Sequence, residues 1–346
     1  MSGPSVVAVA GHLCVDVTPE LGEAPGLEPG RLYEVGAARL TLGGCVANTA
    51  LALHATGVPT RVSATVGDDP LGDIARRLLD EQGIGTEGVA TARGAATSYS
   101  LVFQPRGQDR TFWHHPGANA AFTGREVDLD GVDVLHVGYP PLLPALLTDD
   151  AEPLLQLLQE ARRRGITTSL DMVVVDPSAA VAQLDWRRIL GRILPYVDIA
   201  TPSIDDLTSA LGLRSNPSDA LVEEGARQLI EDGCAVATVS AGARGAFVLS
   251  AERERLAAGG AILASVASTW ASVADWVPAE VPRTMMSTNG AGDAATAGLL
   301  YGLAQGAALR PSARMAARFA AASIAGERPS AETARAWASE LSRPLL

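Results

Sequence analysis

A glycine-rich turn that ends in a single acid offers the clearest chemistry in this sequence. Residues 287–303 read STNGAGDAATAGLLYGL, so that Gly290, Ala291 and Gly292 come directly before Asp293 and an apolar, Ala-rich run follows. Backbone N–H groups at the start of a helix have no partner within the helix and carry a partial positive charge, which suits an anion. The small side chains of the turn would let an anion approach the backbone closely.

The position of Asp293 beside this predicted anion site favours catalysis over simple binding. A carboxylate repels a bound phosphate, but it is well placed to accept the proton of a hydroxyl that attacks the phosphate. Phosphoryl transfer needs both parts, because donors must face the developing charge while a base orients the nucleophile. An Asp at a helix start also stabilises the helix dipole by roughly 0.3–1 kcal/mol, so the turn alone leaves a purely structural role open.

Two further clusters contain residues suited to binding a polar substrate. Gly43 and Gly44 lead into a predicted helix, CVANTALALHATG, in which the amide of Asn48 offers a donor and an acceptor to neighbouring hydroxyls. Asp16 follows the first predicted strand, SVVAVAGHL, and its carboxylate could accept from two hydroxyls at once. A strand-end Asp that caps a turn is the alternative interpretation of Asp16.

A third glycine pair follows a later predicted strand. Gly242 and Gly245, in VSAGARGAF, would let a ligand's base or backbone approach the chain, although a plain turn would also use these glycines. The sequence has no Gly-Lys-Ser/Thr motif, which excludes a P-loop, and no GxGxxG after the first strand, which weakens a dinucleotide-binding interpretation.

Composition restricts the class of protein. The chain has 346 residues, of which 47% are hydrophobic and only 4% aromatic, and its formal net charge is −12. This acidity disfavours binding to nucleic acids or anionic membranes, so neither partner is expected. No apolar run approaches the roughly 20 residues of a membrane span, and no basic leader precedes the first strand, so we expect a cytoplasmic protein. The three cysteines, Cys14, Cys45 and Cys234, show no disulfide framework or zinc-binding spacing.

The order of predicted elements indicates an α/β fold. Strand-like and helix-like segments alternate through most of the chain, which predicts a mostly parallel sheet covered on both faces and one domain over residues 1–346. Two polar, alternating segments, 13–42 and 95–116, are expected to pair as a small β-sheet inserted in that domain. Residues 250–282 are expected to form a hairpin and a long loop, and Ala-rich helices should follow from Thr288.

Taken together and in this order, the clusters resemble the ribokinase-like sugar kinases of the PfkB family over roughly residues 5–327. GGCVANTALALHATGV followed by VGDDPLGDIARRLLDEQGI resembles the family's N-terminal signature, TSYSLVFQPRGQDRTFWHHPGAN resembles its lid hairpin, and STNGAGDAATAG resembles its C-terminal signature. The resemblance implies a three-layer α/β/α sandwich with a mostly parallel central sheet and a small β lid.

The resemblance also implies roles for particular residues. Asp293 would be the catalytic base, and Gly290, Ala291 and Gly292 would hold the transferred phosphoryl group through their backbone N–H groups. Residues expected to bind the sugar are Asp16, Gly43, Gly44 and Asn48. Residues expected to border the ATP site are Ser240, Gly242, Gly245, Thr288 and Asn289. Mg²⁺ would be held mainly by phosphates and water, with Asp206 contributing through water, and the lid would form a homodimer interface.

Some positions depart from the family's pattern. Ser287 replaces the first Asp of the C-terminal signature, which puts activation by a monovalent cation in doubt. Ser203 and Asp206 stand where the family has Asn-x-x-Glu, so metal dependence could be altered. Four other polar residues near expected strand ends are candidate contacts for substrate or phosphate, each with a structural role as the alternative: His114, His115, Tyr139 and Asp171.

The sequence therefore predicts ATP-dependent phosphorylation of a primary hydroxyl of a small sugar, as by a fructokinase or ribokinase. A nucleoside kinase on the same fold is the first alternative, and a non-catalytic sugar sensor is the second. A nicotinamide dehydrogenase is disfavoured because its glycine fingerprint is absent. Fructose, ribose, a keto-deoxy acid and a nucleoside all remain open as the acceptor.

Overall fold

A large twisted sheet forms the centre of the protein. The structure, a computed structural model, describes residues 4–22, 26, 28–105, 110–213 and 218–342. Within these ranges nine strands form one sheet in the order β13-β12-β11-β10-β9-β8-β1-β4-β5. The pairs from β5 to β11 are parallel, whereas β12 is antiparallel to both of its neighbours. The bounds of these strands are β1 Val7–Gly11, β4 Thr60–Gly67, β5 Val89–Ala92, β8 Val134–Gly138, β9 Thr167–Asp171, β10 Ile199–Ala200, β11 Val236–Ser240, β12 Ala246–Ser250 and β13 Ala274–Val277.

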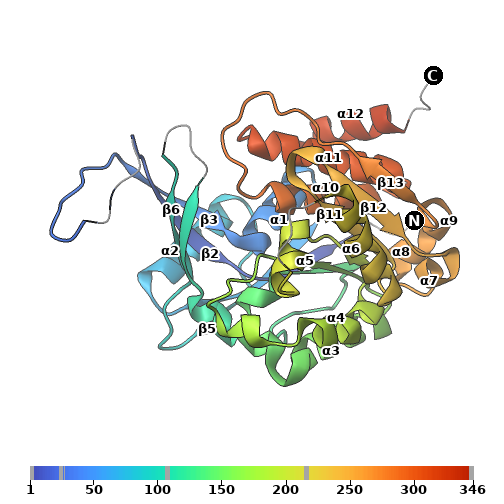
Figure 1. Ribbon diagram of the computed structural model, residues 1–346, viewed down its shortest axis with the longest axis horizontal. Helices are drawn as coiled ribbons and strands as arrows, with labels where there is room; N and C mark the ends of the chain where they lie inside the picture. The colour runs from blue at the N-terminus through green and yellow to red at the C-terminus, as the bar shows by residue number, and fades with distance from the viewer. Residues whose placement is uncertain (1–3, 23–25, 27, 106–109, 214–217, 343–346) are drawn as a thin grey trace.

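Helices cover both faces of this sheet (Figure 1). The alternation in β1 shows why: Val7 and Val9 belong to a core with α1, α10 and α11, whereas Ala8 and Ala10 belong to a second core with α3, α4 and α6. The mostly parallel sheet with helices on both faces, as expected from the sequence, is thus confirmed. The helix bounds are α1 Gly44–Ala55, α2 Pro70–Glu81, α3 Thr148–Arg163, α4 Trp186–Ile193, α5 Ile204–Ala210, α6 Asp219–Glu231, α7 Arg253–Ala257, α8 Ala261–Ser265, α9 Ala267–Trp270, α10 Ala291–Ala304, α11 Leu309–Ile324 and α12 Ala331–Leu341.

A second, smaller sheet projects from the main body at one end of the molecule (Figure 1). In the part of the chain that the structure describes it has four strands in the order β3-β2-β6-β7, and we call it the lid. The lid strands are β2 Cys14–Pro19, β3 Ala38–Gly43, β6 Tyr99–Phe103 and β7 Thr111–His115. Strands from both predicted polar segments therefore pair, since β2 lies parallel to β6. The division into one domain with an inserted lid stays a prediction.

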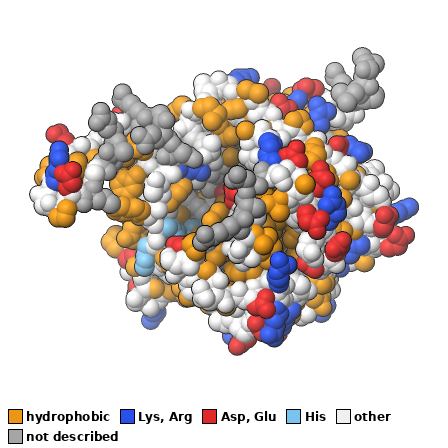
Figure 2. Space-filling model, in the orientation of Figure 1, with side chains coloured by type: hydrophobic (Ala, Val, Ile, Leu, Met, Phe, Trp, Pro, Cys, Tyr) orange, Lys and Arg blue, Asp and Glu red, His pale blue; other side chains and the backbone are white. Residues whose placement is uncertain are grey.

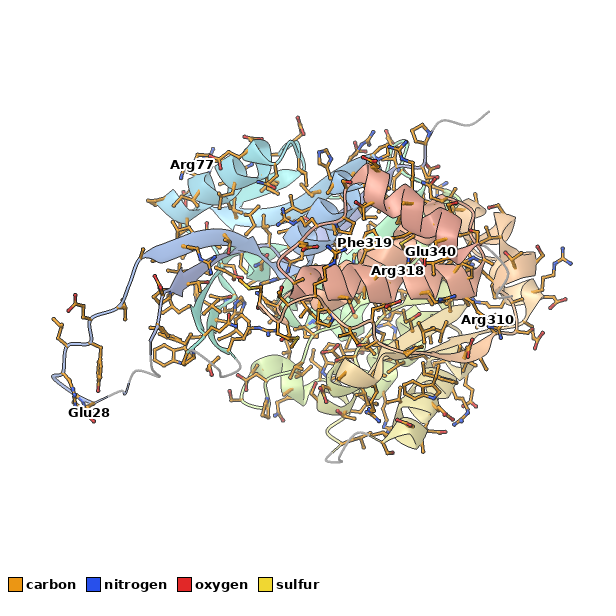
Figure 3. All side chains as sticks on the ribbon, turned by 90° about the horizontal axis from the view of Figure 1, so that it is seen from above. Glu28, Arg77, Arg310, Arg318, Phe319 and Glu340 are labelled. Atoms are coloured by element: carbon orange, nitrogen blue, oxygen red, sulfur yellow. The ribbon has the colours of Figure 1, made fainter. Side chains whose placement is uncertain are left out.

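Local signals explain where several helices begin and end. Asp69 caps α2 by accepting a hydrogen bond from the Gly72 N–H, and Pro70 occupies the first helical position. Gly57, with φ of 82°, follows the end of α1 as a left-handed C-terminal glycine. At the carboxyl end of the chain, Arg318 of α11 and Glu340 of α12 face each other in Figure 3, with Nη1 and Oε2 2.8 Å apart.

Residues 250–282 differ from the expectation of a hairpin and a long loop. The short helices α7, α8 and α9 stand between β12 and β13, although these two strands do pair as an antiparallel ribbon. Trp270 at the end of α9 is fully buried, and its indole Nε1–H donates to the Ala307 carbonyl at 2.7 Å. The segment is therefore ordered by tertiary packing, which its short, weakly periodic helices do not reveal in sequence.

The helices of the main body give no indication of a membrane span. Among the described residues, none of them is both long and apolar enough to cross a bilayer.

Candidate active site

The carboxylate of Asp293 lies in the first turn of α10 and is almost fully buried, with 1% of the residue exposed. Its Oδ2 atom accepts two hydrogen bonds of 2.9 Å, from Asn48 Nδ2 and from the Tyr139 hydroxyl. Its Oδ1 atom is also buried, but it has no hydrogen-bond partner within the described ranges. One oxygen is thus fixed by the protein while the other remains an available acceptor.

Burial raises the pKa of Asp293 to about 6. The hydrogen bonds from Asn48 and Tyr139 favour the carboxylate and oppose this rise, whereas the nearby charge of Asp206 adds to it. A pKa near 6 makes Asp293 a stronger base than an exposed Asp, while it remains mostly ionised at neutral pH. This is the range in which a general base is effective.

Tyr139 reaches Asp293 through an unusual backbone conformation. It follows β8 and precedes the short 3₁₀ helix Pro140–Leu142, with φ of 63° and ψ of 47°. This left-handed conformation costs a bulky residue on the order of 1–3 kcal/mol and is found mostly where function requires it. Here it directs the hydroxyl toward α10, so that the strain is offset by a buried hydrogen bond to the carboxylate.

The glycine turn before α10 has little room on one side and open space on the other. Gly290 caps α10 with φ of 73°, and a Cβ there would lie 3.2 Å from the Asn48 amide. At Gly292, in contrast, the position of a Cβ has no described atom within 4 Å apart from its chain neighbours and the backbone of α10 itself. The Ala291 N–H donates to the Thr288 carbonyl at 3.3 Å, so it is the Gly292 side of the turn that borders space a ligand can enter, as expected for an anion site.

Asp16 lies across from this turn, on the lid strand β2. Its Oδ2 accepts from Asn289 Nδ2 at 3.4 Å, and burial raises its pKa. A Cβ on Gly43 would lie 2.5 Å from Asp16 Oδ1, and one on Gly44 would lie 2.5 Å from His12 Nδ1. Glycine at both positions is thus required for β3 and α1 to pack beside these side chains.

The lid touches the segment before the glycine turn. Gln104 Nε2 donates to the Met286 carbonyl at 3.2 Å, and Arg110 of the lid hairpin donates to the hydroxyl of Thr288. Histidine side chains lie among the lid strands on the face shown in Figure 2. The two hydrogen bonds join the lid to the segment directly before the glycine turn.

Other predicted residues lie farther along the same edge of the sheet. Ser240 ends β11, and Ala241 N–H donates to the Gly245 carbonyl at 2.8 Å, which closes the turn that contains Gly242. A Cβ on Gly245 would lie 2.0 Å from the Val277 carbonyl oxygen, so this glycine is required for packing. No hydrogen bond within the described residues links this turn to Asp293, and its predicted role at the ATP site stays a prediction.

Three acids converge near the expected phosphate position. Burial and the charges of Asp293 and Asp206 raise the pKa of Asp171 well above its usual value. Asp206 also belongs to the capping box of α5, in which its Oδ2 accepts from the N–H of the N-cap residue Ser203 at 2.7 Å and the Ser203 hydroxyl accepts from the Asp206 N–H at 3.1 Å. Buried like charges of this kind are relieved by a cation, so the donor set fits Mg²⁺ held through oxygen atoms and water.

The structure brings the predicted sugar-side residues and the predicted base into one place. The members of this group that are linked by hydrogen bonds or by close packing are Asp16, Gly43, Asn48, Asn289 and Asp293. Two nearby residues, His12 and Cys14, were not singled out as ligands from sequence. Their only signal is their position directly before Asp16, after the first strand.

Comparison with known proteins settles the family. Residues 5–334 match the pfkB family carbohydrate kinases. The chain belongs to this family. Relatives in the pfkB family include an ATP-dependent ribose-1-phosphate kinase of Halopiger xanaduensis, 27% identical over 59% of this chain and 64% of that protein. Fructokinase-2 of Solanum lycopersicum is 26% identical over 40% of this chain and 42% of that protein. Deoxyribokinase of Salmonella typhi is 23% identical over 72% of this chain and 76% of that protein. The matches thus span less than two thirds of the length of the first two of these relatives.

Solved structures share the fold of this chain. Ribokinase of Arabidopsis thaliana, complexed with ribose and ATP, superposes with a TM-score of 0.73 at 18% identity and covers 99% of this chain and 100% of that chain. The nucleoside kinase of Burkholderia thailandensis, in complex with inosine, superposes with a TM-score of 0.68 at 18% identity. The match covers 98% of this chain and 100% of that chain.

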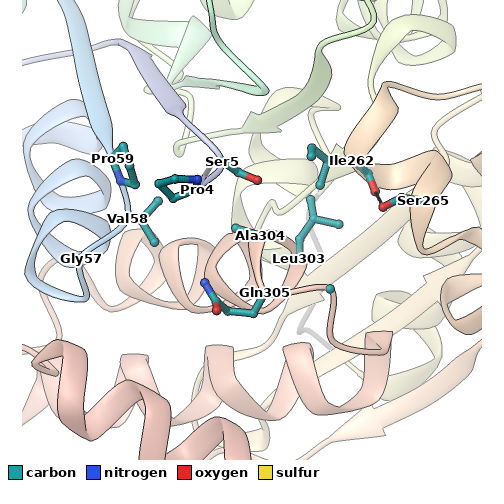
Figure 4. Close-up of a pocket in the computed structure, with 11 residues that line it drawn as sticks. Pro4, Ser5, Gly57, Val58, Pro59, Ile262, Ser265, Leu303, Ala304 and Gln305 are labelled. Carbon is teal, nitrogen blue, oxygen red and sulfur yellow. Dashed lines mark hydrogen bonds between the residues drawn. The ribbon is translucent and has the colours of Figure 1, made fainter. Parts of the chain in front are cut away.

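A separate pocket of about 400 Å³ lies elsewhere in this pfkB-family chain (Figure 4). Its lining includes Val58 and Pro59, directly before β4, together with Leu303, Ala304 and Gln305 at the end of α10. It therefore lies at the amino ends of the parallel strands, at the opposite edge of the sheet from Asp293. Ligands of open α/β sheets bind at the carboxyl edge, so this pocket is not the candidate active site.

The two glycines of the turn should respond differently to the same substitution. Gly290→Ala places a Cβ at a positive φ and against Asn48, so we expect the free energy of unfolding to fall by about 1–2 kcal/mol. Gly292→Ala is the matched control and should not lower stability, because its Cβ meets open space. Urea unfolding of both variants measures this, and equal stabilities would contradict the described conformation of the turn.

Proposed function

We propose that the protein transfers the γ-phosphoryl group of ATP to a primary hydroxyl of a small sugar, as a fructokinase or ribokinase does. The observation that carries this proposal is the state of Asp293. Its Oδ2 is held by Asn48 and Tyr139, and its Oδ1 is buried without a partner in the described chain, beside the first N–H groups of α10. A base next to an anion site suits phosphoryl transfer.

In the proposed reaction Asp293 Oδ1 accepts the proton of the sugar hydroxyl as the hydroxyl oxygen attacks the γ-phosphorus. A new P–O bond forms to the sugar, the bond between the γ-phosphorus and the bridging oxygen breaks, and ADP leaves with that electron pair. The N–H groups of Gly290, Ala291 and Gly292 would stabilise the charge on the phosphoryl oxygens, and the Ala291 N–H would first have to leave the Thr288 carbonyl to which it donates at 3.3 Å. Asn48 and Tyr139 keep the base oriented throughout, because they bind its other oxygen.

The sugar would bind between the lid and the glycine turn. Asp16 is the acceptor on the lid side, and its link to Asn289 connects it to the turn. Gly43, Gly44 and Asn48 complete the predicted sugar contacts at the start of α1. Lid contacts such as Gln104 with the Met286 carbonyl would exclude water and limit ATP hydrolysis.

The nucleotide would lie along the carboxyl edge of the sheet. Ser240, Gly242 and Gly245 would border it at the end of β11, with Thr288 and Asn289 near its phosphates. When bound, Mg²⁺ supplies positive charge to the phosphate oxygens, and the nearest acids that fit it are Asp171 and Asp206. Ser287 stands where relatives have an acid, so activation by potassium is not part of the proposal.

The lid also supports the proposed homodimer. Three large hydrophobic side chains of its strands are exposed in the single chain: Leu40 by 41%, Phe112 by 40% and Trp113 by 45%. Exposed aromatic and aliphatic groups on a sheet are typical of an interface that a partner covers.

The names of the relatives support a sugar acceptor, because they include a ribose-1-phosphate kinase, a fructokinase and a deoxyribokinase. A nucleoside is the alternative acceptor on this fold. ATP consumption measured over a panel of sugars, sugar phosphates and nucleosides, with ³¹P detection of the product, distinguishes the two. Phosphorylation of nucleosides alone would overturn the sugar assignment, and binding without any turnover would indicate a sensor.

Asp293→Asn should abolish most of the activity on the acceptor that the panel identifies. The amide cannot accept the proton at neutral pH, so we expect kcat to fall by about 10²- to 10⁴-fold. Asp73→Asn is the matched control, because Asp73 is also an acid in the first turn of a helix but is exposed on α2. Steady-state kinetics measure both, and near-normal turnover of Asp293→Asn would end the proposal.

Tyr139→Phe should change the pH profile of kcat/KM. Because the base acts when ionised, the wild-type rate should rise with pH through about 6 and then level off. The Tyr139 hydroxyl favours the carboxylate, so its removal raises the pKa of Asp293 and moves the acidic limb to higher pH. Tyr196→Phe, before β10 at the opposite edge of the sheet, should leave the profile unchanged. A profile of Tyr139→Phe that superposes on the wild type would contradict this role.

A further inference from the structure

A cluster of nitrogen and sulfur ligands lies beside the candidate active site and has no role in the proposed reaction. Among the described residues, the ligand atoms of His12, Cys14 and His114 all lie within 4.8 Å of one another. His12 lies between β1 and β2, Cys14 begins β2, and His114 lies on β7 at the edge of the lid. The cluster thus joins the main body to the outermost lid strand.

The histidines of this cluster have unused ring nitrogens. His114 Nδ1 forms a hydrogen bond of 3.1 Å with the Ser100 hydroxyl, while its Nε2 is buried without a partner in the described structure. Both ring nitrogens of His12 are buried and equally lack a described partner. Leaving such groups unsatisfied costs about 1–3 kcal/mol each, so ordinary packing does not account for them.

The geometry of the two histidines suits metal binding. The His12 and His114 rings lie close together, with their centroids 5.0 Å apart. The hydrogen bond between His114 and Ser100 is the arrangement that orients metal-binding histidines, in which one nitrogen is fixed and the other binds the ion.

We propose that His12, Cys14 and His114 bind a zinc ion. Two imidazoles and one thiolate are a ligand set typical of Zn²⁺, and three protein ligands leave a fourth position for water or a carboxylate. Ligand atoms in tetrahedral zinc sites are roughly 3.5 Å apart, so small side-chain rotations from the described positions are sufficient. Water would take the fourth position, because the Asp16 carboxylate, with its Oδ1 3.4 Å from Cys14 Sγ, is the acceptor proposed for the sugar.

Binding requires the Cys14 thiol to lose its proton, since the thiolate is the ligand. Zn²⁺ therefore displaces the thiol proton as the Zn–S bond forms. The thiol already donates a hydrogen bond to Asp16 Oδ1, which provides a path for the proton to the carboxylate and then to water. The step consumes no oxidant or reductant, because zinc stays in the divalent state throughout.

The register of the lid explains how the site is assembled. Asp16, Ser100 and His114 are opposite one another across β2, β6 and β7, so their side chains share one face of the lid. Neighbouring residues of a strand point to opposite faces, so His115 is directed away from this cluster. The ion would therefore fix β7 to the β1–β2 junction at the border of the proposed sugar site.

The test uses the untagged full chain with zinc and with cobalt(II) as a spectroscopic probe. Zinc binding is measured by competition with a chromophoric chelator. We expect one equivalent of zinc to bind, and one equivalent of cobalt to give intense visible bands of a tetrahedral site together with a thiolate-to-cobalt charge-transfer band. Cys14→Ser should remove the charge-transfer band, and both Cys14→Ser and His114→Gln should weaken zinc binding by at least about 100-fold.

The matched controls are His115→Gln, which changes the neighbouring histidine, and Cys234→Ala, which changes another buried free cysteine. Both should bind zinc as the wild type does. His114 lies at the lid edge, so His114→Gln should fold normally, and circular dichroism of each variant confirms this. Absence of stoichiometric binding, or equal losses in the controls and in the two ligand variants, would overturn the zinc site. Neither readout depends on kinase activity, so the zinc site can fail while the proposed function stands.

Discussion

The buried carboxylate of Asp293 sets the constraint that the rest of the site satisfies. A carboxylate in the interior is costly unless donors reach it, so α1 and the loop after β8 must approach α10 within hydrogen-bond distance. Asn48 and Tyr139 provide these donors from positions 245 and 154 residues away in sequence. Glycine is then favoured at position 290, because its φ is 73° and a Cβ there would lie only 3.2 Å from the Asn48 amide.

Much of the fold could be predicted because its signals are local. Asp69 and Pro70 mark the start of α2, Gly57 marks the end of α1, and the glycine turn marks the start of α10. These positions depend on caps and on backbone freedom, which a short stretch of sequence specifies. The mostly parallel sheet followed from the alternation of strand-like and helix-like segments. Within residues 250–282 the expected hairpin pairing is present, but the expected long loop was wrong, because packing around Trp270 orders short helices there.

The parts of the site that escaped prediction depend on contacts between distant segments. The strained conformation of Tyr139 has no sequence signal beyond its position after a strand, because neighbouring residues impose it. Zinc-binding spacing was absent from the cysteines, yet the lid register brings His114 next to Cys14 across β6. Spacing rules detect ligands that share one turn or helix, and they cannot detect ligands that a sheet brings together.

The buried polar atoms without partners indicate which ligand each part of the site would bind. Oδ1 of Asp293, both nitrogens of His12 and Nε2 of His114 are all buried without partners among the described residues. Each such atom raises the free energy of the folded chain by about 1–3 kcal/mol until a ligand satisfies it. A hydroxyl suits Asp293 Oδ1, which is an acceptor beside the anion site. A metal cation suits the imidazoles of His12 and His114 beside the Cys14 thiol. The region around Asp293 therefore suits a hydroxyl, and the cluster of His12, Cys14 and His114 suits a metal ion. Asp16 lies between the two, since it accepts hydrogen bonds from Asn289 and from Cys14.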